Sequence, residues 1–403
     1  MSSPGRSTNW NAKKGIALNT VQTEDLYALL SQPAAPFREH YVKRYIAAFC
    51  DRAHVPYFED DVGNIVVGVD SRPAYRRVVK LASAEPLRIF VAHMDHPGCH
   101  GVRWRGDQLM VRWLGGSPVK HLRGAKLWLA TDEGIHATAR LEKAHIATHG
   151  RAIESATLAI DSGLTLLRSV RAADIYGGFS FRAPVWKMRD RLYTKAADDL
   201  VGVFSILQTA AWWFAKRRTD PMFLGLLTRA EEVGFVGAVE HFELGWWRAA
   251  KRPLLGVSLE ASRTLPGALV GGGPVVRLGD RRTVFDANGL QVLTQLAQQH
   301  LRTQFQRRVM DGGACEGTAM TAYGIPTIAM SVPLGNYHNQ GFEGGPDCRV
   351  AEGPAPEFVH VDDIRGMLKL CRAVMTPRVF RQDSWRPTRE NLLQNARSYR
   401  HLL

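Results

Sequence analysis

The chain has 403 residues, of which 45% are hydrophobic and 22% are charged, so wholesale disorder is excluded and roughly two to three domains are expected. No apolar run reaches the roughly 18 residues of a membrane-spanning helix, and the first residues contain no apolar stretch typical of a secretory signal. The formal net charge is +14, but half of this excess lies in basic terminal extensions, residues 1–15 and 377–403, where no zinc-finger or RNA-binding motif supports a nucleic-acid partner.

In chain order, the first predicted elements are helical. Apolar side chains recur at helical spacing over residues 24–53, and a turn signal precedes an apolar strand over residues 65–69. From residue 87 onward, polar or ionisable residues directly follow four short apolar runs: Leu87–Ala92, Met222–Leu227, Leu254–Leu259 and Ile325–Val332. Helical patterns cover Leu200–Ala215, Gly234–Trp247, Asn288–Leu301 and Asp362–Val374. Strands that alternate with helices predict an α/β fold, with a mainly parallel mixed sheet flanked by helices.

The stretch over residues 101–187 differs from the rest, because glycine-rich turns separate short alternating runs there. These runs are Leu109–Trp113, Leu127–Ala130, His136–Leu141 and Thr157–Ile160. We therefore expect a small β-rich domain that is inserted into a discontinuous catalytic domain, which comprises residues 16–100 and 188–376.

Ionisable residues follow the predicted strands at the edge where parallel sheets bind ligands. His93 follows the first run, Glu232 the second, Glu260 the third and His338 the fourth, while Asp198 lies in the segment KAADDLVG. Two imidazoles and three carboxylates suit zinc, cobalt or manganese better than calcium, which prefers oxygen ligands alone. Five side chains are too many for one tetrahedral ion. We therefore expect two divalent metal ions, zinc in the first place, with one bridging carboxylate and a shared water.

Two further carboxylates lie near this set in the sequence. Glu231 is the neighbour of Glu232, and it is predicted to be the general base that takes a proton from the water and passes it to the leaving amine. Asp95, two residues after His93, is expected to accept the imidazole N–H and fix the tautomer of that ligand. Without metal, the three ligand carboxylates are expected to repel one another, which raises their pKa values.

Five segments carry a specific resemblance: HMDHPG (93–98), KAADDLVG (195–202), RAEEVGFVGA (229–238), SLEAS (258–262) and VPLGNYHN (332–339). Their order and spacing, over roughly residues 40–375, resemble the glutamyl/deblocking aminopeptidase family of dinuclear metallopeptidases, the tetrahedral-aminopeptidase type. The resemblance implies an aminopeptidase with two zinc or cobalt ions. In it, Asp198 would be the bridge, Glu231 the base, and the remaining ligands would be His93, His338, Glu232 and Glu260.

The resemblance also implies a homo-oligomer, in many members a dodecamer, in which the inserted domain serves assembly or substrate access. A cis peptide bond is implied between Asp198 and Asp199. Two positions differ from the usual pattern of the family. Glu260 stands where Asp is usual, and Cys-Glu-Gly-Thr-Ala (315–319) stands where a Gly-Gly-Thr-Asp-Ala block is usual, so that the aspartate is missing.

Other residues allow two interpretations. Asp199 is either the N-cap of the helix that follows it or a member of the site. His96 and His100 are four residues apart, but the proline between them breaks the helix that a metal-binding pair at this spacing would need. Asp311 and Glu316 flank a glycine-rich turn, and either is a candidate to hold the amino group of a substrate.

The pattern favours metal-dependent hydrolysis of the first peptide bond of short peptides. A cytoplasmic setting is expected, because the five cysteines show no CxxC spacing. One alternative is a related di-metal N-acyl amino acid deacylase or carboxypeptidase, which Glu260 supports. Another is a non-catalytic metal-stabilised scaffold or polyanion binder, but a scaffold has no need of Glu231. The expected partners are a peptide substrate and further copies of the chain, without a membrane or a nucleic acid.

Overall fold

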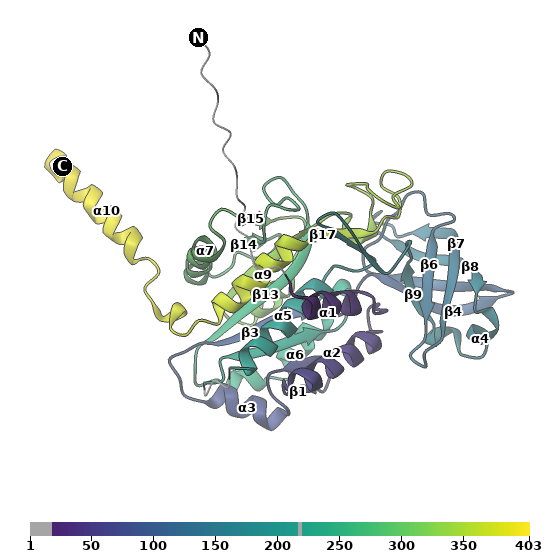
Figure 1. Cartoon of the computed structure of the whole chain (residues 1–403), viewed down its shortest axis with the longest axis horizontal. Helices are drawn as coiled ribbons and strands as arrows, with labels where there is room; N and C mark the ends of the chain where they lie inside the picture. The colour runs from purple at the N-terminus through teal and green to yellow at the C-terminus, as the bar shows by residue number, and fades with distance from the viewer. Residues whose placement is uncertain (1–17, 217–219) are drawn as a thin grey trace, which may run out of the picture.

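The computed structural model describes residues 18–216 and 220–403, and these residues form two parts that lie side by side along the long axis (Figure 1). One part is an eight-stranded mixed sheet with helices on both faces, and the other is a closed β-barrel. Helix α10 (Arg386–Tyr399) extends away from the sheet at the end opposite to the barrel. The predicted fold class, an α/β fold with a separate β-rich part, is confirmed.

Four parallel strands form the centre of the sheet. The strand order is β1-β2-β12-β3-β13-β16-β14-β15, and β12, β3, β13 and β16 run parallel to one another. Every residue of β3, β12 and β16 is buried, which explains their continuous apolar runs in the sequence. The strands are β1 (Tyr57–Glu59), β2 (Ile65–Val67), β3 (Leu87–His93), β12 (Phe223–Thr228), β13 (Leu254–Arg263), β14 (Val275–Asp280), β15 (Gln306–Met310) and β16 (Thr327–Leu334).

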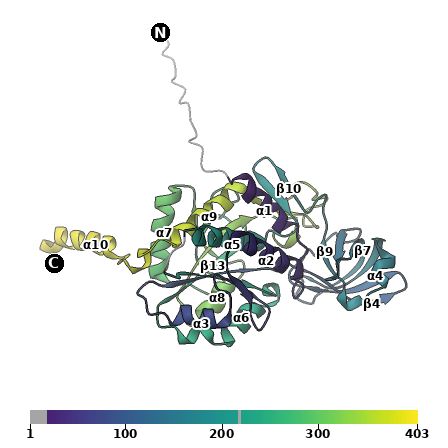
Figure 2. The ribbon, with the colours of Figure 1, turned by 60° about the horizontal axis from the view of Figure 1, so that its bottom comes forward.

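Helices cover both faces of this sheet (Figure 2). Helices α1, α2, α5, α7 and α9 pack on one face, and α3, α6 and α8 pack on the other, each layer around its own apolar cluster. The helices are α1 (Thr20–Leu30), α2 (His40–Ala53), α3 (Arg72–Lys80), α5 (Leu200–Phe214), α6 (Val236–Glu243), α7 (Ala287–Leu301), α8 (Glu316–Ala322) and α9 (Val361–Val374). Two short 3-10 segments, η2 (Glu231–Val233) and η4 (Tyr337–Asn339), follow β12 and β16.

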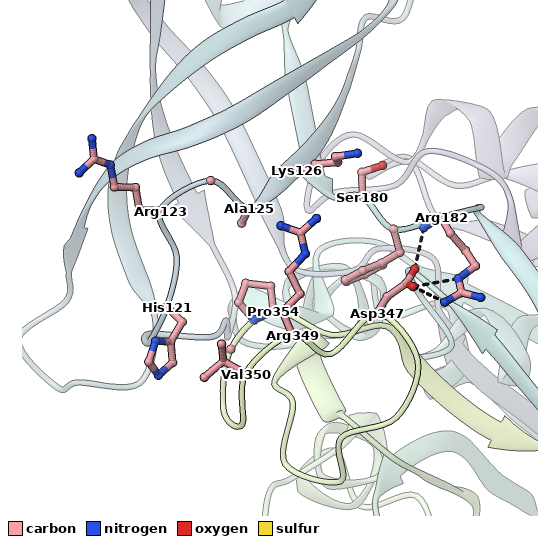
Figure 3. A pocket seen from close by; sticks show the side chains of 13 residues that line it. His121, Arg123, Ala125, Lys126, Ser180, Arg182, Asp347, Arg349, Val350 and Pro354 are labelled. Atoms are coloured by element: carbon pink, nitrogen blue, oxygen red, sulfur yellow. Dashed lines mark hydrogen bonds and ion pairs between the residues drawn. The ribbon is translucent and has the colours of Figure 1, made fainter.

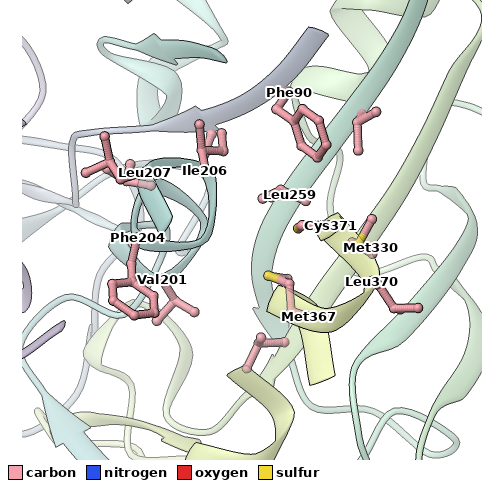
Figure 4. Close-up of a cluster of buried hydrophobic side chains, with 14 of the residues drawn as sticks. Phe90, Val201, Phe204, Ile206, Leu207, Leu259, Met330, Met367, Leu370 and Cys371 are labelled. Atoms are coloured by element: carbon pink, nitrogen blue, oxygen red, sulfur yellow. The ribbon is translucent and has the colours of Figure 1, made fainter. Parts of the chain in front are cut away.

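The larger apolar cluster lies between the sheet and the layer of α5 and α9 (Figure 4). Phe90 and Leu259 from the strands, Phe204 and Ile206 from α5, and Met367 from α9 are all at most 1% exposed. Burial of apolar surface stabilises by about 25 cal/mol per Å², so this cluster holds the strands firmly in register. The same strands carry the ionisable residues at their ends.

The β-rich part is an antiparallel barrel with the strand order β4-β5-β8-β7-β6-β9. Its side chains alternate between two faces, as in β7, where Ala137, Ala139 and Leu141 are buried and Thr138 and Arg140 are exposed. The inward side chains form an apolar cluster of their own. The strands are β4 (Gly98–Arg105), β5 (Gln108–Leu114), β6 (Lys126–Ala130), β7 (His136–Ile146), β8 (Ile153–Ser162) and β9 (Tyr176–Phe179).

The remaining elements are small or peripheral. A three-stranded sheet has the order β10-β11-β17, with β10 (Val185–Met188), β11 (Arg191–Thr194) and β17 (Glu357–His360). Within the predicted C-terminal extension, α10 (Arg386–Tyr399) has no buried residue, and the predicted extension over residues 1–15 lies outside the described residues. Among the residues that the structure describes, no helix is long and apolar enough to cross a membrane.

Two predicted helices are wrong in their extent. The pattern over residues 24–53 corresponds to two helices, α1 and α2, because Pro33 and Pro36 lie between them and proline interrupts helical hydrogen bonding. The pattern over Gly234–Trp247 contains only the short helix α6. Gly245 adopts a left-handed conformation (φ 69°) just beyond it, which terminates the helix.

Candidate metal centre

The ionisable residues that follow the predicted strands lie together at the carboxyl edge of the sheet. His93 is the last residue of β3, Glu260 lies in the second half of β13, and His338 lies in η4 after β16. Glu232 lies in η2 after β12, and Asp198 precedes the N-cap of α5. The parallel register aligns these strand ends, so side chains from five distant segments meet in one place.

The two carboxylate oxygens of Asp198 face two different imidazoles. Oδ1 lies 3.3 Å from Nε2 of His93, and Oδ2 lies 3.6 Å from Nε2 of His338. Oε1 of Glu260 lies 3.5 Å from the same nitrogen of His93, and Oε2 of Glu232 lies 3.0 Å from the same nitrogen of His338. Each imidazole therefore has one carboxylate of its own and shares Asp198 with the other imidazole.

This arrangement fits a pair of divalent cations. Ligand atoms lie within 4.8 Å of one another in three groups among the described residues, namely Asp198–Glu232–His338, His93–Asp199–Glu260 and His93–Glu231–Glu232. Within these groups, five buried atoms lack a hydrogen-bond partner among the described residues, namely Oδ1 of Asp198, Oδ2 of Asp199, Oε1 of Glu232, Oε2 of Glu260 and Nε2 of His338. Buried polar atoms without a partner are costly, and imidazoles combined with carboxylates are typical ligands of zinc, cobalt and manganese.

Glu231 lies beside the cluster, and Asp95 holds its backbone. Oε2 of Glu231 is 3.8 Å from Nε2 of His93. The N–H groups of Glu231 and Glu232 donate to the two carboxylate oxygens of Asp95, at 2.9 and 3.2 Å. The expected hydrogen bond from the imidazole of His93 to the carboxylate of Asp95 is replaced by a closer contact to the backbone. Nδ1 of His93 is closer to the backbone carbonyl of Asp95 (3.1 Å) than to its carboxylate (3.6 Å), because that carboxylate turns toward the two N–H groups.

The turn that carries Glu231 is fixed from two other sides. Ala230 has φ 51°, a left-handed conformation that is costly for a residue with a side chain. Its N–H donates to the buried carboxylate of Glu39 at 3.1 Å, and the N–H of Arg229 donates to the side-chain oxygen of Asn64 at 3.0 Å. Sequence reasoning did not identify Glu39 or Asn64 as positioning residues. Asn64 lies in the predicted turn before β2, where it has no link to the site along the sequence.

Glu357 on β17 is a second positioning residue that the sequence pattern did not indicate. One of its carboxylate oxygens accepts the N–H groups of Ala197 (2.7 Å) and Asp198 (3.2 Å), and the other accepts the N–H of His338 (2.9 Å). The side chain is fully buried. The sequence contains one signal for Glu357, which is a charged residue next to apolar residues in a short strand. Its distance along the sequence from the metal-binding segments gave no reason to connect it with them.

Asp199 and the two nearby histidines have defined places. The peptide bond between Asp198 and Asp199 is cis, as the resemblance implies. Oδ1 of Asp199 accepts the N–H of Gly202 at 3.1 Å and thus caps α5, while the side chain also belongs to one potential ligand group. His96 contacts the carbonyl of Asp198 (2.8 Å) and His100 the carbonyl of Pro36 (2.8 Å), so the two histidines do not form a metal pair.

The two candidates for an amino-group site differ strongly. Asp311 is exposed and pairs with Arg308 at 3.3 Å. Glu316 is fully buried, accepts a hydrogen bond from the hydroxyl of Thr228, and leaves Oε2 without a partner among the described residues. Burial raises the pKa of Glu316 to about 8.

Burial and mutual charges shift the pKa values of the cluster in both directions. Burial raises the pKa of Glu260 to about 7 and also raises the pKa of Glu232. Burial opposes protonation of His338, but the neighbouring Glu232 and Asp198 raise its pKa to about 10. The expectation of a raised pKa is wrong for Asp198. Burial favours its neutral form, but the imidazoles of His338 and His93, which face its two oxygens, outweigh this and hold its pKa below the ordinary value.

A cavity of about 560 Å³ opens beside the cluster, within the size range of small-ligand sites. Glu260 and His338 line it, together with residues of the loop between β7 and β8 of the barrel. A second cavity of about 280 Å³ lies where the barrel meets the loop of residues 347–354 (Figure 3). Among the described residues that line the second cavity, none belongs to the cluster.

Comparison with known proteins gives the chain a family. The sequence pattern of the M42 glutamyl aminopeptidases matches residues 77–341, which is more than half of the chain. The chain belongs to the M42 glutamyl aminopeptidase family. Membership makes it a peptidase, a hydrolase that acts on peptides, as the sequence analysis expected. A search of curated proteins finds no match.

Several solved structures have a similar fold. The TET1 peptidase of Pyrococcus horikoshii is 19% identical, with a TM-score of 0.67 over 88% of this chain and 99% of that one. An aminopeptidase of the archaeon Desulfurococcus kamchatkensis is 19% identical, with a TM-score of 0.68 over 89% and 96%. A TET aminopeptidase of a marine-sediment Thaumarchaeota archaeon is 15% identical, with a TM-score of 0.69 over 90% and 99%. At these identities the likeness to M42-type structures supports the fold.

Proposed function

We propose that the chain is a dinuclear metallo-aminopeptidase that removes N-terminal residues from peptides. The observation that carries the proposal is the position of Asp198 between the imidazoles of His93 and His338, with the carboxylate of Glu231 at 3.8 Å from His93. A purely structural ion-pair cluster would explain the imidazoles and their carboxylates. It would not explain why the half-buried carboxylate of Glu231 lies beside them on a turn whose backbone N–H groups donate to Asp95.

Each ligand has a place in this proposal. His93 and Glu260 would hold one ion, His338 and Glu232 the other, and Asp198 would bridge them. Bound zinc, cobalt or manganese would polarise the scissile carbonyl and acidify a water. The donor set therefore accounts for two ions per chain.

Glu231 moves the proton in this mechanism. Its carboxylate takes a proton from the attacking water and gives it to the nitrogen of the leaving peptide, first as a general base and then as a general acid. Burial, reinforced by the charge of Glu232, raises the pKa of Glu231 well above its ordinary value, which suits a carboxylate that holds a proton between the two steps. Asp95 acts through the backbone of Glu231 and fixes the direction of its side chain.

We also propose that the chain assembles with further copies of itself. The Pyrococcus horikoshii relatives are described as a dodecamer and as a peptidase that assembles into a tetrahedron or an octahedral shell. Residues 16–100 and 188–376 would form the catalytic domain, and the β-rich insertion, residues 101–187, would contribute to assembly or substrate access. The free cysteines, four of them buried, are consistent with the expected cytoplasmic setting.

Metal analysis combined with a substrate panel tests the proposal. The purified chain is expected to contain two divalent ions per chain, to lose activity with a chelator and to regain it with zinc, cobalt or manganese. Among aminoacyl anilides, N-acyl amino acids and C-terminally cleaved peptides, only the aminoacyl anilides should be hydrolysed. Hydrolysis confined to N-acyl amino acids or to C-terminal residues would instead indicate the deacylase or carboxypeptidase alternative, for which Glu260 remains the supporting residue.

A further inference from the structure

The cavity between the barrel and the loop of residues 347–354 is lined largely by basic side chains (Figure 3). Four of the lining residues are cationic at neutral pH, namely Arg123, Lys126, Arg182 and Arg349. Among the described residues that line it, the one carboxylate belongs to Asp347. At about 280 Å³ the cavity lies just below the usual size of small-molecule sites, which favours a compact ligand.

The carboxylate of Asp347 is already engaged by one of these cations. Its Oδ1 accepts hydrogen bonds from the guanidinium of Arg182, with Nε at 2.8 Å, and its Oδ2 accepts the backbone N–H of the same residue at 2.9 Å. Figure 3 shows this pair at one side of the cavity. No carboxylate of the described lining is therefore left for the other three cations.

Two of these three cations face each other from opposite walls. Lys126 and Ser180 lie side by side on the barrel, where the N–H of Ser180 donates to the carbonyl of Lys126 at 2.8 Å. Arg349 comes from the loop and extends toward both of them, whereas Arg123 points away (Figure 3). Within the described part of the chain, the ammonium of Lys126, the guanidinium of Arg349 and the hydroxyl of Ser180 have no side-chain hydrogen bond or ion pair.

Exposed arginines elsewhere on the barrel are arranged differently. Arg140 pairs with Asp161 at 2.8 Å, and Arg168 pairs with Asp107 at 3.0 Å. In the cavity, like charges from the barrel and the loop converge on a concave surface and repel one another, without an acidic partner of their own. An anion taken up from solution would replace this repulsion by attraction.

We propose that this cavity binds a phosphate group, which Arg349, Lys126 and the hydroxyl of Ser180 would hold. A guanidinium offers parallel N–H donors that match phosphate oxygens, and its charge-assisted hydrogen bonds are about twice as strong as neutral ones. A phosphate group carries about −1.5 to −2 charge at pH 7, which two cations without an acidic partner can balance. The inference does not depend on the proposed peptidase function, because among the described residues none of the metal centre lines this cavity.

The proposed site joins the barrel to the loop that leads away from His338. The backbone closes this loop at its base, where the N–H of Gly341 donates to the carbonyl of Gly353 at 2.8 Å. Lys126 belongs to strand β6 of the barrel and Arg349 to the loop, so a phosphate group held by both adds a link between the two parts. A ligand that binds only the folded chain stabilises it, so phosphate should also raise the midpoint of thermal unfolding.

Two sources can supply a phosphate group, namely free phosphate and a phosphate ester of a small molecule. Calorimetric titration of the metal-loaded full chain uses inorganic phosphate and adenosine 5′-monophosphate as probes, with adenosine as the probe that lacks the phosphate group. At least one of the two phosphate probes is expected to bind with a Kd below about 1 mM, and adenosine should not bind. A lower Kd for adenosine monophosphate than for phosphate indicates an ester, and any other order indicates free phosphate.

The double variant Lys126→Gln/Arg349→Gln removes both cations. It should raise the Kd by at least about tenfold and abolish the increase in the thermal midpoint. Both side chains are exposed, and each single variant should raise the Kd in part, which provides a second route if the double variant folds poorly. The matched control Arg103→Gln/Lys143→Gln removes the same two charges from exposed positions of the barrel outside the cavity, and it should leave the Kd unchanged.

Three results would overturn the inference. The first is that neither phosphate probe binds the unaltered chain. The second is binding that the double variant retains, which would place the anion elsewhere, for example at the metal centre, or binding that the control weakens equally, which would indicate an attraction without a defined site. The third concerns a short RNA oligonucleotide as an additional probe. If RNA alone binds, and the double variant loses this binding, the cavity contacts a nucleic acid instead of a small phosphate.

Discussion

The sheet edge and the barrel place their polar groups in opposite ways. At the sheet edge, the side chains of His93, Asp198 and His338 are at most 8% exposed. They lie at the ends of strands that contribute to a large apolar core. In the barrel, exposed and buried side chains alternate over the first half of β7, and the inward side chains of the barrel form an apolar cluster without such a group. Because buried charge is expensive, a fold keeps it only where it performs a task. On the proposed function, the sheet edge would carry the chemistry, and the barrel would contribute to assembly or substrate access.

The largest effect is expected from a change to Glu231, the proposed general base at the sheet edge. Glu231→Gln keeps the shape of the side chain but cannot take up a proton, so kcat is expected to fall by about 10²–10⁴-fold while metal content stays at that of the unaltered enzyme. Steady-state kinetics and metal analysis measure the two effects. Glu240→Gln, on the exposed side of α6, is the matched control. Activity near that of the unaltered enzyme would show that another group is the base.

Two core variants, one in the barrel and one in the sheet, test which of the two cores supports metal binding. Leu158 in β8 and Leu224 in β12 are at most 1% exposed, so each change to Ala should cost about 2–5 kcal/mol of unfolding free energy in denaturant titration. Only Leu224→Ala should also weaken metal retention, because β12 leads into the segment that carries Glu232. Loss of metal from Leu158→Ala under conditions where it remains folded would show that the barrel also supports the metal centre.

Lys195 lies where the sheet and the barrel meet, and its protonation makes the free energy of unfolding depend on pH. Its Nζ donates to the carbonyl of Gln32 and lies 5.2 Å from the ring of Trp128 in the barrel, and burial lowers its pKa to about 7. Above this pH the unfolded chain binds a proton that the folded chain does not, so this group makes stability rise from pH 7 toward pH 10.

The variant Lys195→Met removes this contribution. The difference in unfolding free energy between Lys195→Met and the unaltered chain should therefore change by about 1–3 kcal/mol between pH 6.5 and 9.5, as measured by denaturant titration at both pH values. A difference that is the same at both pH values would mean that the buried amine stays charged in the folded state.

The smallest effect is expected far from both parts, on α10. Arg386 and Glu390 form an ion pair at 2.8 Å, with side chains that are 74% and 61% exposed. Glu390→Gln should change the unfolding free energy by less than about 0.5 kcal/mol and leave peptide hydrolysis unchanged. A larger loss of stability or of activity would show that α10 contacts a further copy of the chain in solution.

The sequence indicated that His93, Glu232, Glu260 and His338 converge, because each lies at or just after the end of an apolar run and parallel strands align their ends. Their roles as metal ligands stay a prediction. His93, Glu260 and His338 could be connected in this way before any coordinates were known. Glu357 could not, because its contribution consists of hydrogen bonds to backbone N–H groups of distant loops, which leave no spacing in the sequence. The break between α1 and α2 was missed for a different reason. Apolar residues keep helical spacing on both sides of it, and only Pro33 and Pro36 mark it in the sequence.

The carboxylate of Glu357 ties the loop of Asp198, the proposed bridge between the two ions, to the loop of His338, a proposed ligand of one of them. Because a single side chain accepts hydrogen bonds from the backbone of both Asp198 and His338, neither loop can move without straining the other. On the proposed assignment, an ion held by His338 would also hold Asp198, which would be a ligand of the neighbouring ion as well. Loading is expected to be cooperative, so that a half-filled centre is scarce at any metal concentration.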